Sequence, residues 1–191
     1  MARGRLSEDQ PLPFASLFPI ISYQKIVEVA MSEFARASGI STVCARLMGM
    51  YGPWQDPGQS SLVQRLVDAA VTGKPVNLEN LFLANADDTA DFSYIKDVAR
   101  AIALLQTAEK LSYNVYNIGS GKLTSNREFV EAVESVVPGF KVDLPPGHGP
   151  FPSLPVMETK RLHADTGFSP KFDTQSAIQD YMEWLKAGNP K

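Results

Sequence analysis

Short apolar segments of strand type alternate with helical segments along this chain, and that alternation restricts it to the α/β class. Apolar residues at three- and four-residue spacing predict the helices, and β-branched or continuous apolar runs predict the strands. Residues 1–20 contain several prolines and are expected to be irregular. The expected helices are 22–38, 61–72, 97–109, 125–136, 158–165 and 174–186, and the expected strands are 41–48, 76–83, 91–95, 114–118 and 141–144.

Charge and composition exclude several classes of protein. Eighteen basic and 21 acidic residues give a net charge of −3, so no basic excess favours nucleic acid or an anionic membrane surface as a partner. No apolar run is long enough for a membrane helix, and the N-terminus lacks the apolar core of a signal peptide. Cys44 is the single cysteine, and the two histidines are not at metal-ligand spacing. We therefore expect a soluble, cytoplasmic protein without a metal site.

The sequence contains no G-x-G-x-x-G motif, which usually marks the dinucleotide-binding turn of an α/β protein. The nearest match is Gly119-Ser-Gly121-Lys-Leu-Thr124, between an expected strand and an expected helix, but its third glycine is absent. It also lacks the first glycine of a phosphate-binding P-loop. We therefore interpret this segment as a turn that connects a strand to a helix.

Four short motifs follow one another along the chain. They are Ser22-Tyr-Gln-Lys-Ile-Val-Glu28 with Pro11-Leu-Pro13 upstream, Arg46-Leu-Met-Gly-Met-Tyr-Gly-Pro53, Asp91-Phe-Ser-Tyr-Ile-Lys-Asp-Val-Ala99 and Tyr116-Asn-Ile-Gly-Ser-Gly121. Their order and spacing resemble the C-terminal portion of the extended short-chain dehydrogenase/reductases, the NAD-dependent epimerase/dehydratase family. A closing Gly167-Phe-Ser-Pro170 and a last helix with Trp184 also resemble the end of that family's sequences.

This resemblance implies a truncated Rossmann-like part, made of late strands and the catalytic helix, followed by the smaller substrate-binding domain. Residues 1–54 would be the remnant of the NAD-binding domain. Residues 55–191 would be mainly the substrate-binding domain, with return strands to the Rossmann sheet. Complete members of the family bind NAD or NADP. Because the glycine-rich turn is missing, we expect neither cofactor to bind this chain alone.

The catalytic helix of the family carries a Tyr and a Lys four residues later, so that both lie on one helical face. Lys25 matches the family's Lys, which holds the cofactor ribose, but Ile21 stands at the Tyr position. Tyr23 is two residues from Lys25 and therefore about 200° around a regular helix. Two interpretations remain open: a non-helical start brings Tyr23 into the site, or Tyr23 packs or caps the helix and Lys25 is a solvated helix residue.

Other positions bear on the substrate. Gly49 matches a substrate-facing Asn of the family, and Ala90 stands where nucleotide-sugar enzymes often have an Arg for the diphosphate. The candidate substrate contacts are Gly49, Gln55, Arg65, Tyr94 and Lys96, with Arg161 and His163 as further candidates. For each, a packing or surface role is the alternative interpretation.

The first functional hypothesis is an NAD-dependent epimerase/dehydratase-like oxidoreductase that acts on a nucleotide sugar and is inactive as this chain alone. The second is a non-catalytic module, derived from the same family, that binds a ligand or a partner. The third is an NAD(P)-dependent reductase of a non-nucleotide ketone or alcohol, which the missing diphosphate-binding Arg favours. The apolar stripe of helix 22–38 (Ile26, Val29, Ala30 and Phe34) is expected to face the sheet or to form a homodimer.

Overall fold

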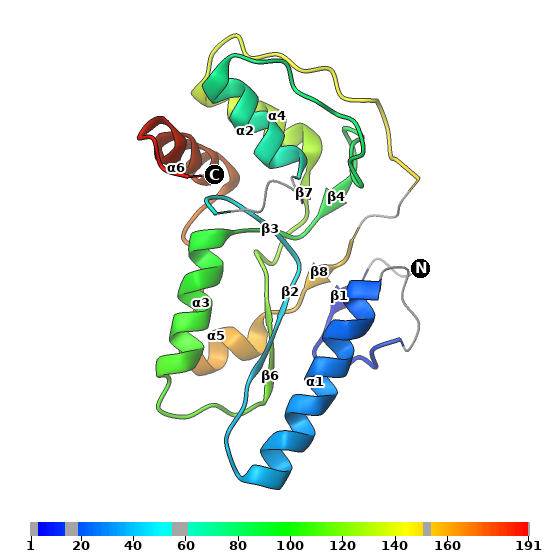
Figure 1. Cartoon of the computed structure of the whole chain (residues 1–191), viewed down its shortest axis with the longest axis vertical. Coiled ribbons are helices and arrows are strands. Elements are labelled where there is room, and N and C mark those ends of the chain that lie inside the picture. The colour runs from blue at the N-terminus through cyan, green and yellow to red at the C-terminus, as the bar shows by residue number, and fades with distance from the viewer. Residues whose placement is uncertain (1–3, 14–18, 55–60, 151–153, 191) are drawn as a thin grey trace.

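The computed structural model describes residues 4–13, 19–54, 61–150 and 154–190. Within these ranges the helices are α1 (Pro19–Ser38), α2 (Leu62–Thr72), α3 (Ile95–Thr107), α4 (Asn126–Val136), α5 (Lys160–Thr166) and α6 (Thr174–Lys186). The strands are β1 (Arg5–Leu6), β2 (Cys44–Leu47), β3 (Gly49–Tyr51), β4 (Thr89–Ala90), β5 (Phe92–Tyr94), β6 (Val115–Ile118), β7 (Thr124–Ser125) and β8 (Val156–Met157). Every helix expected from the sequence is present, and the mixed helices and strands confirm the α/β class (Figure 1).

The strands pair as four short ladders among the described residues, and three of these ladders are parallel. The longest joins β2 to β6, from Cys44 opposite Val115 to Leu47 opposite Ile118. Strand β3 pairs with β5, and β1 pairs with β8, while β4 and β7 are antiparallel. The expectation of irregular structure throughout 1–20 is therefore wrong, because Arg5–Leu6 forms a strand with a partner about 150 residues later.

The two expected strands at 76–83 and 141–144 are not present. Their apolar residues, among them Val76, Leu78 and Val142, pack against the helices from irregular backbone. No neighbouring strand supplies the hydrogen bonds of a ladder to either segment. An apolar run indicates burial, and burial without a pairing partner does not make a strand.

Two hydrophobic clusters organise the described residues. The first lies between α2, α4 and α6 and includes the aromatic side chains of Tyr51 and Tyr94. The second lies between α3, β6 and α5, with Leu162 and Phe168 at its centre. In Figure 1 the first cluster occupies the upper part of the molecule and the second the lower left. Strand β6, which belongs to the second cluster, pairs with β2 from the part of the chain before residue 54. The division into two domains at residue 54 stays a prediction.

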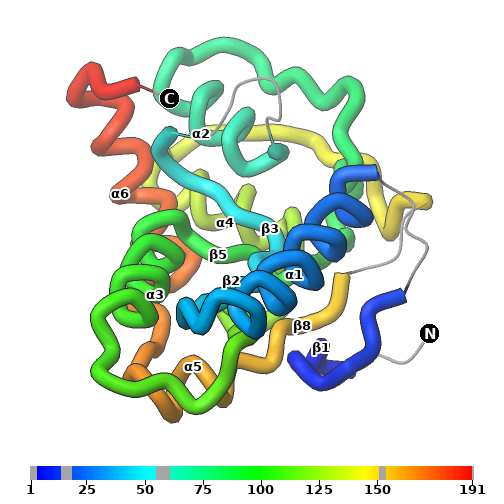
Figure 2. The backbone as a smooth tube through the Cα atoms, turned by 60° about the horizontal axis from the view of Figure 1, so that its bottom comes forward, coloured from blue at the N-terminus to red at the C-terminus, as the bar shows by residue number. Residues whose placement is uncertain are grey.

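Helix α1 lies beside β2 (Figure 2). Its apolar side faces solvent. None of its residues is buried; the side chains of Ile26, Val29 and Phe34 are 62%, 65% and 49% exposed. Of the two uses expected for this stripe, packing against the sheet is not seen in the described residues, and the homodimer stays a prediction. The helix is attached instead by the Glu28 carboxylate, which accepts two hydrogen bonds from the half-buried guanidinium of Arg46 at 2.6 and 2.9 Å. None of the helices in the described ranges is long and apolar enough to span a bilayer.

Candidate functional site

The residues of the family's catalytic helix lie on α1. Tyr23 is 63% exposed and sits within regular helix, since α1 begins at Pro19. Tyr23 and Lys25 therefore lie on different sides of the helix. The Lys25 Nζ donates a hydrogen bond of 2.5 Å to the carbonyl of Pro13, and Ile21 supplies no exchangeable proton four residues earlier. The geometry brings no Tyr–Lys pair together on this helix.

Tyr94 and Lys96 meet at a single carboxylate on α6. The Tyr94 hydroxyl donates to Asp180, and the Lys96 Nζ lies 2.7 Å from an Asp180 oxygen. Burial and the adjacent Asp180 carboxylate raise the pKa of Tyr94 above its ordinary value, so its phenol stays protonated and donates. Lys96 also lies 5.8 Å from the centre of the Trp184 ring. Both candidates therefore join the start of α3 to α6.

The remaining substrate-side candidates within the described residues each have contacts of their own. The Arg65 guanidinium donates to the carbonyls of Asn77 and Glu79 at 2.8 and 2.7 Å and so fixes the segment after α2. A Cβ on Gly49 would lie 2.8 Å from the Phe92 ring, so this ring fills the space of a side chain at position 49. Gln55 lies outside the described residues.

Arg161 and His163, on α5, also have structural contacts. The Arg161 guanidinium binds the Asp9 carboxylate and lies 4.1 Å from the centre of the Tyr113 ring. The His163 Nδ1 is 2.9 Å from the carbonyl oxygen of Phe168 at the end of the same helix. These contacts hold the N-terminal segment and the α5 terminus in place.

Asp91 has a role that no sequence motif predicted: its carboxylate is fully buried. One oxygen accepts from the Ser120 backbone N–H at 2.7 Å and from the Ser120 hydroxyl at 2.6 Å. The other accepts from the backbone N–H groups of Gly121 and Met157 at 3.2 and 2.9 Å. Asp91 thus joins β5, the turn after β6 and strand β8.

This arrangement decides what the Gly119–Gly121 turn can bind. A dinucleotide pyrophosphate would need the free N–H groups of such a turn. Here the N–H groups of Ser120 and Gly121 already donate to Asp91, and a Cβ on Gly119 would lie 2.7 Å from the same carboxylate. The turn therefore does not fit NAD, in agreement with its interpretation as a strand-to-helix connection.

Asp97 has a role related to that of Asp91. An acidic residue at the start of a helix predicts an N-cap, so the sequence favours Asp97 as the cap of α3. The structure instead places the N-cap at Tyr94. The buried Asp97 carboxylate accepts from the backbone N–H groups of Lys171 and Phe172 and so fixes the segment before α6.

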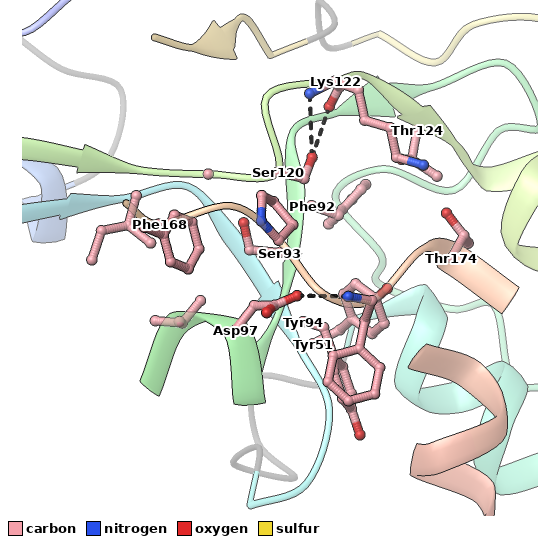
Figure 3. A pocket seen from close by; sticks show the side chains of 15 residues that line it. Tyr51, Phe92, Ser93, Tyr94, Asp97, Ser120, Lys122, Thr124, Phe168 and Thr174 are labelled. Atoms are coloured by element: carbon pink, nitrogen blue, oxygen red, sulfur yellow. Dashed lines mark hydrogen bonds between the residues drawn. The ribbon is translucent and has the colours of Figure 1, made fainter. Parts of the chain in front are cut away.

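Tyr94, Asp97 and Ser120 all border a small cavity at the meeting point of the two clusters (Figure 3). Within the described part of the chain, no three His, Cys, Asp or Glu side chains gather as a metal site requires.

Curated relatives of this chain include enzymes of nucleotide-sugar conversion. A protein named putative UDP-glucose 4-epimerase of Methanocaldococcus jannaschii is 25% identical over 191 residues, with 96% of this chain and 58% of that protein covered. The dTDP-glucose 4,6-dehydratase of Streptomyces niveus is 24% identical over 183 residues, with 93% of this chain and 52% of the relative covered. The chain thus spans little more than half the length of these relatives.

Solved structures share the fold. The UDP-glucose 4-epimerase of Thermotoga maritima, solved with UDP-glucose, superposes with a TM-score of 0.77 at 22% identity, covering 97% of this chain and 58% of that one. The dTDP-glucose 4,6-dehydratase of Bacillus anthracis, solved with NAD, gives a TM-score of 0.74 at 22% identity, covering 96% and 56%. At these identities the likeness establishes the fold. The sequence pattern of the NAD dependent epimerase/dehydratase family matches residues 8–119, more than half of the chain, and the chain therefore belongs to this family.

Proposed function

We propose that this chain forms the substrate side of a nucleotide-sugar epimerase or dehydratase and does not hold NAD or NADP by itself. Family membership and the relatives that act on UDP- and dTDP-sugars support the substrate class. In this proposal residues 55–191 form mainly the substrate-binding domain, and residues 1–54 belong to the cofactor domain. The reaction of the complete protein is hydride transfer at a hydroxyl-bearing carbon, for which bound NAD supplies the hydride acceptor.

The observation that carries the proposal is the occupation of the Gly119–Gly121 turn by Asp91. The turn's N–H groups donate to a buried carboxylate of the same chain, so they are not offered to a phosphate. Two further observations support the absence of hydride transfer by this chain alone. Lys25 donates to the Pro13 carbonyl, and Ile21 occupies the position of the family's Tyr. We derive no catalytic step from these residues.

Isothermal titration calorimetry with NAD and NADP tests the cofactor part of the proposal. We expect no binding in the micromolar range, and micromolar binding of either cofactor would overturn it. Thermal melting with UDP-glucose, UDP-glucuronic acid and dTDP-glucose tests the substrate part. We expect at least one of them to raise Tm, because ligand binding to the folded state stabilises it. Stabilisation by apolar ketones alone would instead favour a reductase of a non-nucleotide substrate.

The exposed side of α1 favours a second candidate function, a non-catalytic module that binds a partner. Its apolar side chains face solvent, which is unusual for a helix that has no partner. A homodimer through helix 22–38 would cover them. Size-exclusion chromatography with light scattering tests this with Phe34→Ser, and Ile102→Ser on α3 is the matched control, since the two side chains are 49% and 47% exposed. A dimer that only Phe34→Ser dissociates supports the module; a monomeric parent chain contradicts it.

A further inference from the structure

A small cavity lies where the two hydrophobic clusters meet. Tyr51 and Tyr94 border it from the first cluster, and Val98, Ile118 and Phe168 border it from the second. The volume open to the centre of a water molecule is about 20 Å³. Figure 3 shows the side chains of Ser93 and Asp97 toward one side of this space and those of Thr124 and Thr174 toward the other.

Ser93 is the polar group that this cavity leaves unexplained. It is 5% exposed and lies between Phe92 and Tyr94 on β5, whose side chains belong to the first cluster. Since side chains alternate along a strand, Ser93 points toward the second cluster. Its Oγ is buried and has no hydrogen-bond partner among the described residues. A buried hydroxyl without a partner destabilises a fold, so an unseen partner is expected at this position.

The size and lining of the cavity identify that partner. A buried water needs roughly 10–15 Å³ of such volume and two to four polar neighbours. The cavity exceeds this volume by little, so its enclosed part has room for one water molecule. The hydroxyls of Thr124 and Thr174 and the Asp97 carboxylate provide polar groups besides Ser93, and the carboxylate disfavours an anion. We propose that one ordered water molecule occupies this cavity and binds Ser93 Oγ together with a neighbouring polar group of the lining.

The bound water lies where the two hydrophobic clusters meet and contributes to the packing between them. It lies against β5 and against the segment before α6, and both of these line the cavity. Asp97 fixes the second of them through the N–H groups of Lys171 and Phe172. Hydration therefore contributes to how the two clusters are held together. A water molecule at this place does not depend on whether the chain binds a nucleotide sugar.

The sign of the stability change in Ser93→Ala tests the proposal. If water binds the hydroxyl, the variant loses that hydrogen bond and Tm falls by about 2–4 °C. If the cavity is dry, the variant removes an unpartnered polar group, and Tm stays unchanged or rises. The matched control is Ser135→Ala, whose hydroxyl donates within its own helix to the Ala132 carbonyl at 2.7 Å. We expect its Tm to change by less than about 1 °C.

Two further measurements make the test independent of Ser93→Ala: the stability of Ser93→Val, and a crystal structure at high resolution. Valine would displace the water and leave any other polar group that binds it unpartnered, so its Tm should fall further than that of Ser93→Ala. In a dry cavity valine would fill empty space and raise Tm. Density for a water within hydrogen-bond distance of Ser93 Oγ supports the proposal. An empty cavity, or a Ser93 hydroxyl bonded directly to a protein atom, overturns it.

Discussion

Replacing Asp91 by asparagine should destabilise this protein far more than its small size change suggests. The carboxylate is fully buried and accepts four hydrogen bonds, two on each oxygen. An asparagine side chain retains one acceptor oxygen and presents an NH₂ group in place of the other. Whichever way the amide turns, two of the four groups that donate to Asp91 then face the NH₂ group in place of an acceptor oxygen.

The magnitude follows from those two donors. A buried donor left without an acceptor costs about 1–3 kcal/mol, so Asp91→Asn should lower the free energy of unfolding by about 2–6 kcal/mol. For a chain of this size the corresponding fall in Tm is on the order of 10 °C. Loss of the carboxylate should also loosen the Gly119–Gly121 turn and strand β8, since their N–H groups donate to it.

Thermal and urea unfolding, followed by circular dichroism of the helices, measure this change. The matched control is Asp87→Asn in the same segment. The Asp87 carboxylate pairs with Arg127 at 2.8 Å, but both side chains are largely solvated, at 42% and 56% exposure. Such a surface pair contributes less than about 1 kcal/mol. Equal Tm values for the two variants would refute the assignment of Asp91 as a buried anchor.

Three further variants test the same structure. Gly119→Ala places a Cβ 2.7 Å from the Asp91 carboxylate and should cost about 1–3 kcal/mol in urea unfolding; a neutral effect would contradict this packing. Glu28→Gln weakens the attachment of α1, so hydrogen exchange over 19–38 should speed up, whereas Glu33→Gln, in an exposed pair, should not change it. Hydrogen bonds from the start of α6 hold the pKa of Asp173 below 3.8. Its folded pKa is depressed, so its contribution to stability is present above pH 3.8 and is lost as pH falls through the lower folded value. Asp173→Asn should therefore flatten the acid dependence of Tm below about pH 4, and an unchanged profile would contradict it.

The helices could be predicted from the sequence because their signals are local. Ser125 and Glu128 form a reciprocal capping box at the start of α4, and their three-residue spacing is visible in the sequence. Gly73 and Gly167 end α2 and α5 in the left-handed conformation that glycine adopts without strain. The apolar spacing of α1 also predicted a helix correctly. It did not predict which side of that helix faces solvent, because this depends on what packs beside it.

The strands and the candidate site depended on distant parts of the chain. Strand β1 exists because β8 lies beside it, and the segment 141–144 is not a strand because no partner reaches it. The sequence marked Tyr94 and Lys96 as substrate contacts from a family motif. It held no signal that Asp180, more than 80 residues later, would bind both side chains. Roles assigned by resemblance stay predictions until the neighbours of each residue are known.

The segment from Asp88 to Asp97 fixes three later loops, and this changes how variants in it must be interpreted. The buried carboxylates of Asp88, Asp91 and Asp97 accept backbone N–H groups from the loops at 149, at 120–121 and at 171–172. Tyr94 and Lys96 lie in the same segment and bind α6. A substitution at either position can therefore abolish a ligand response by loosening these loops, without any contact to the ligand. Loss of a sugar-nucleotide response in such a variant is evidence for a substrate contact only where Tm without ligand equals that of the parent chain.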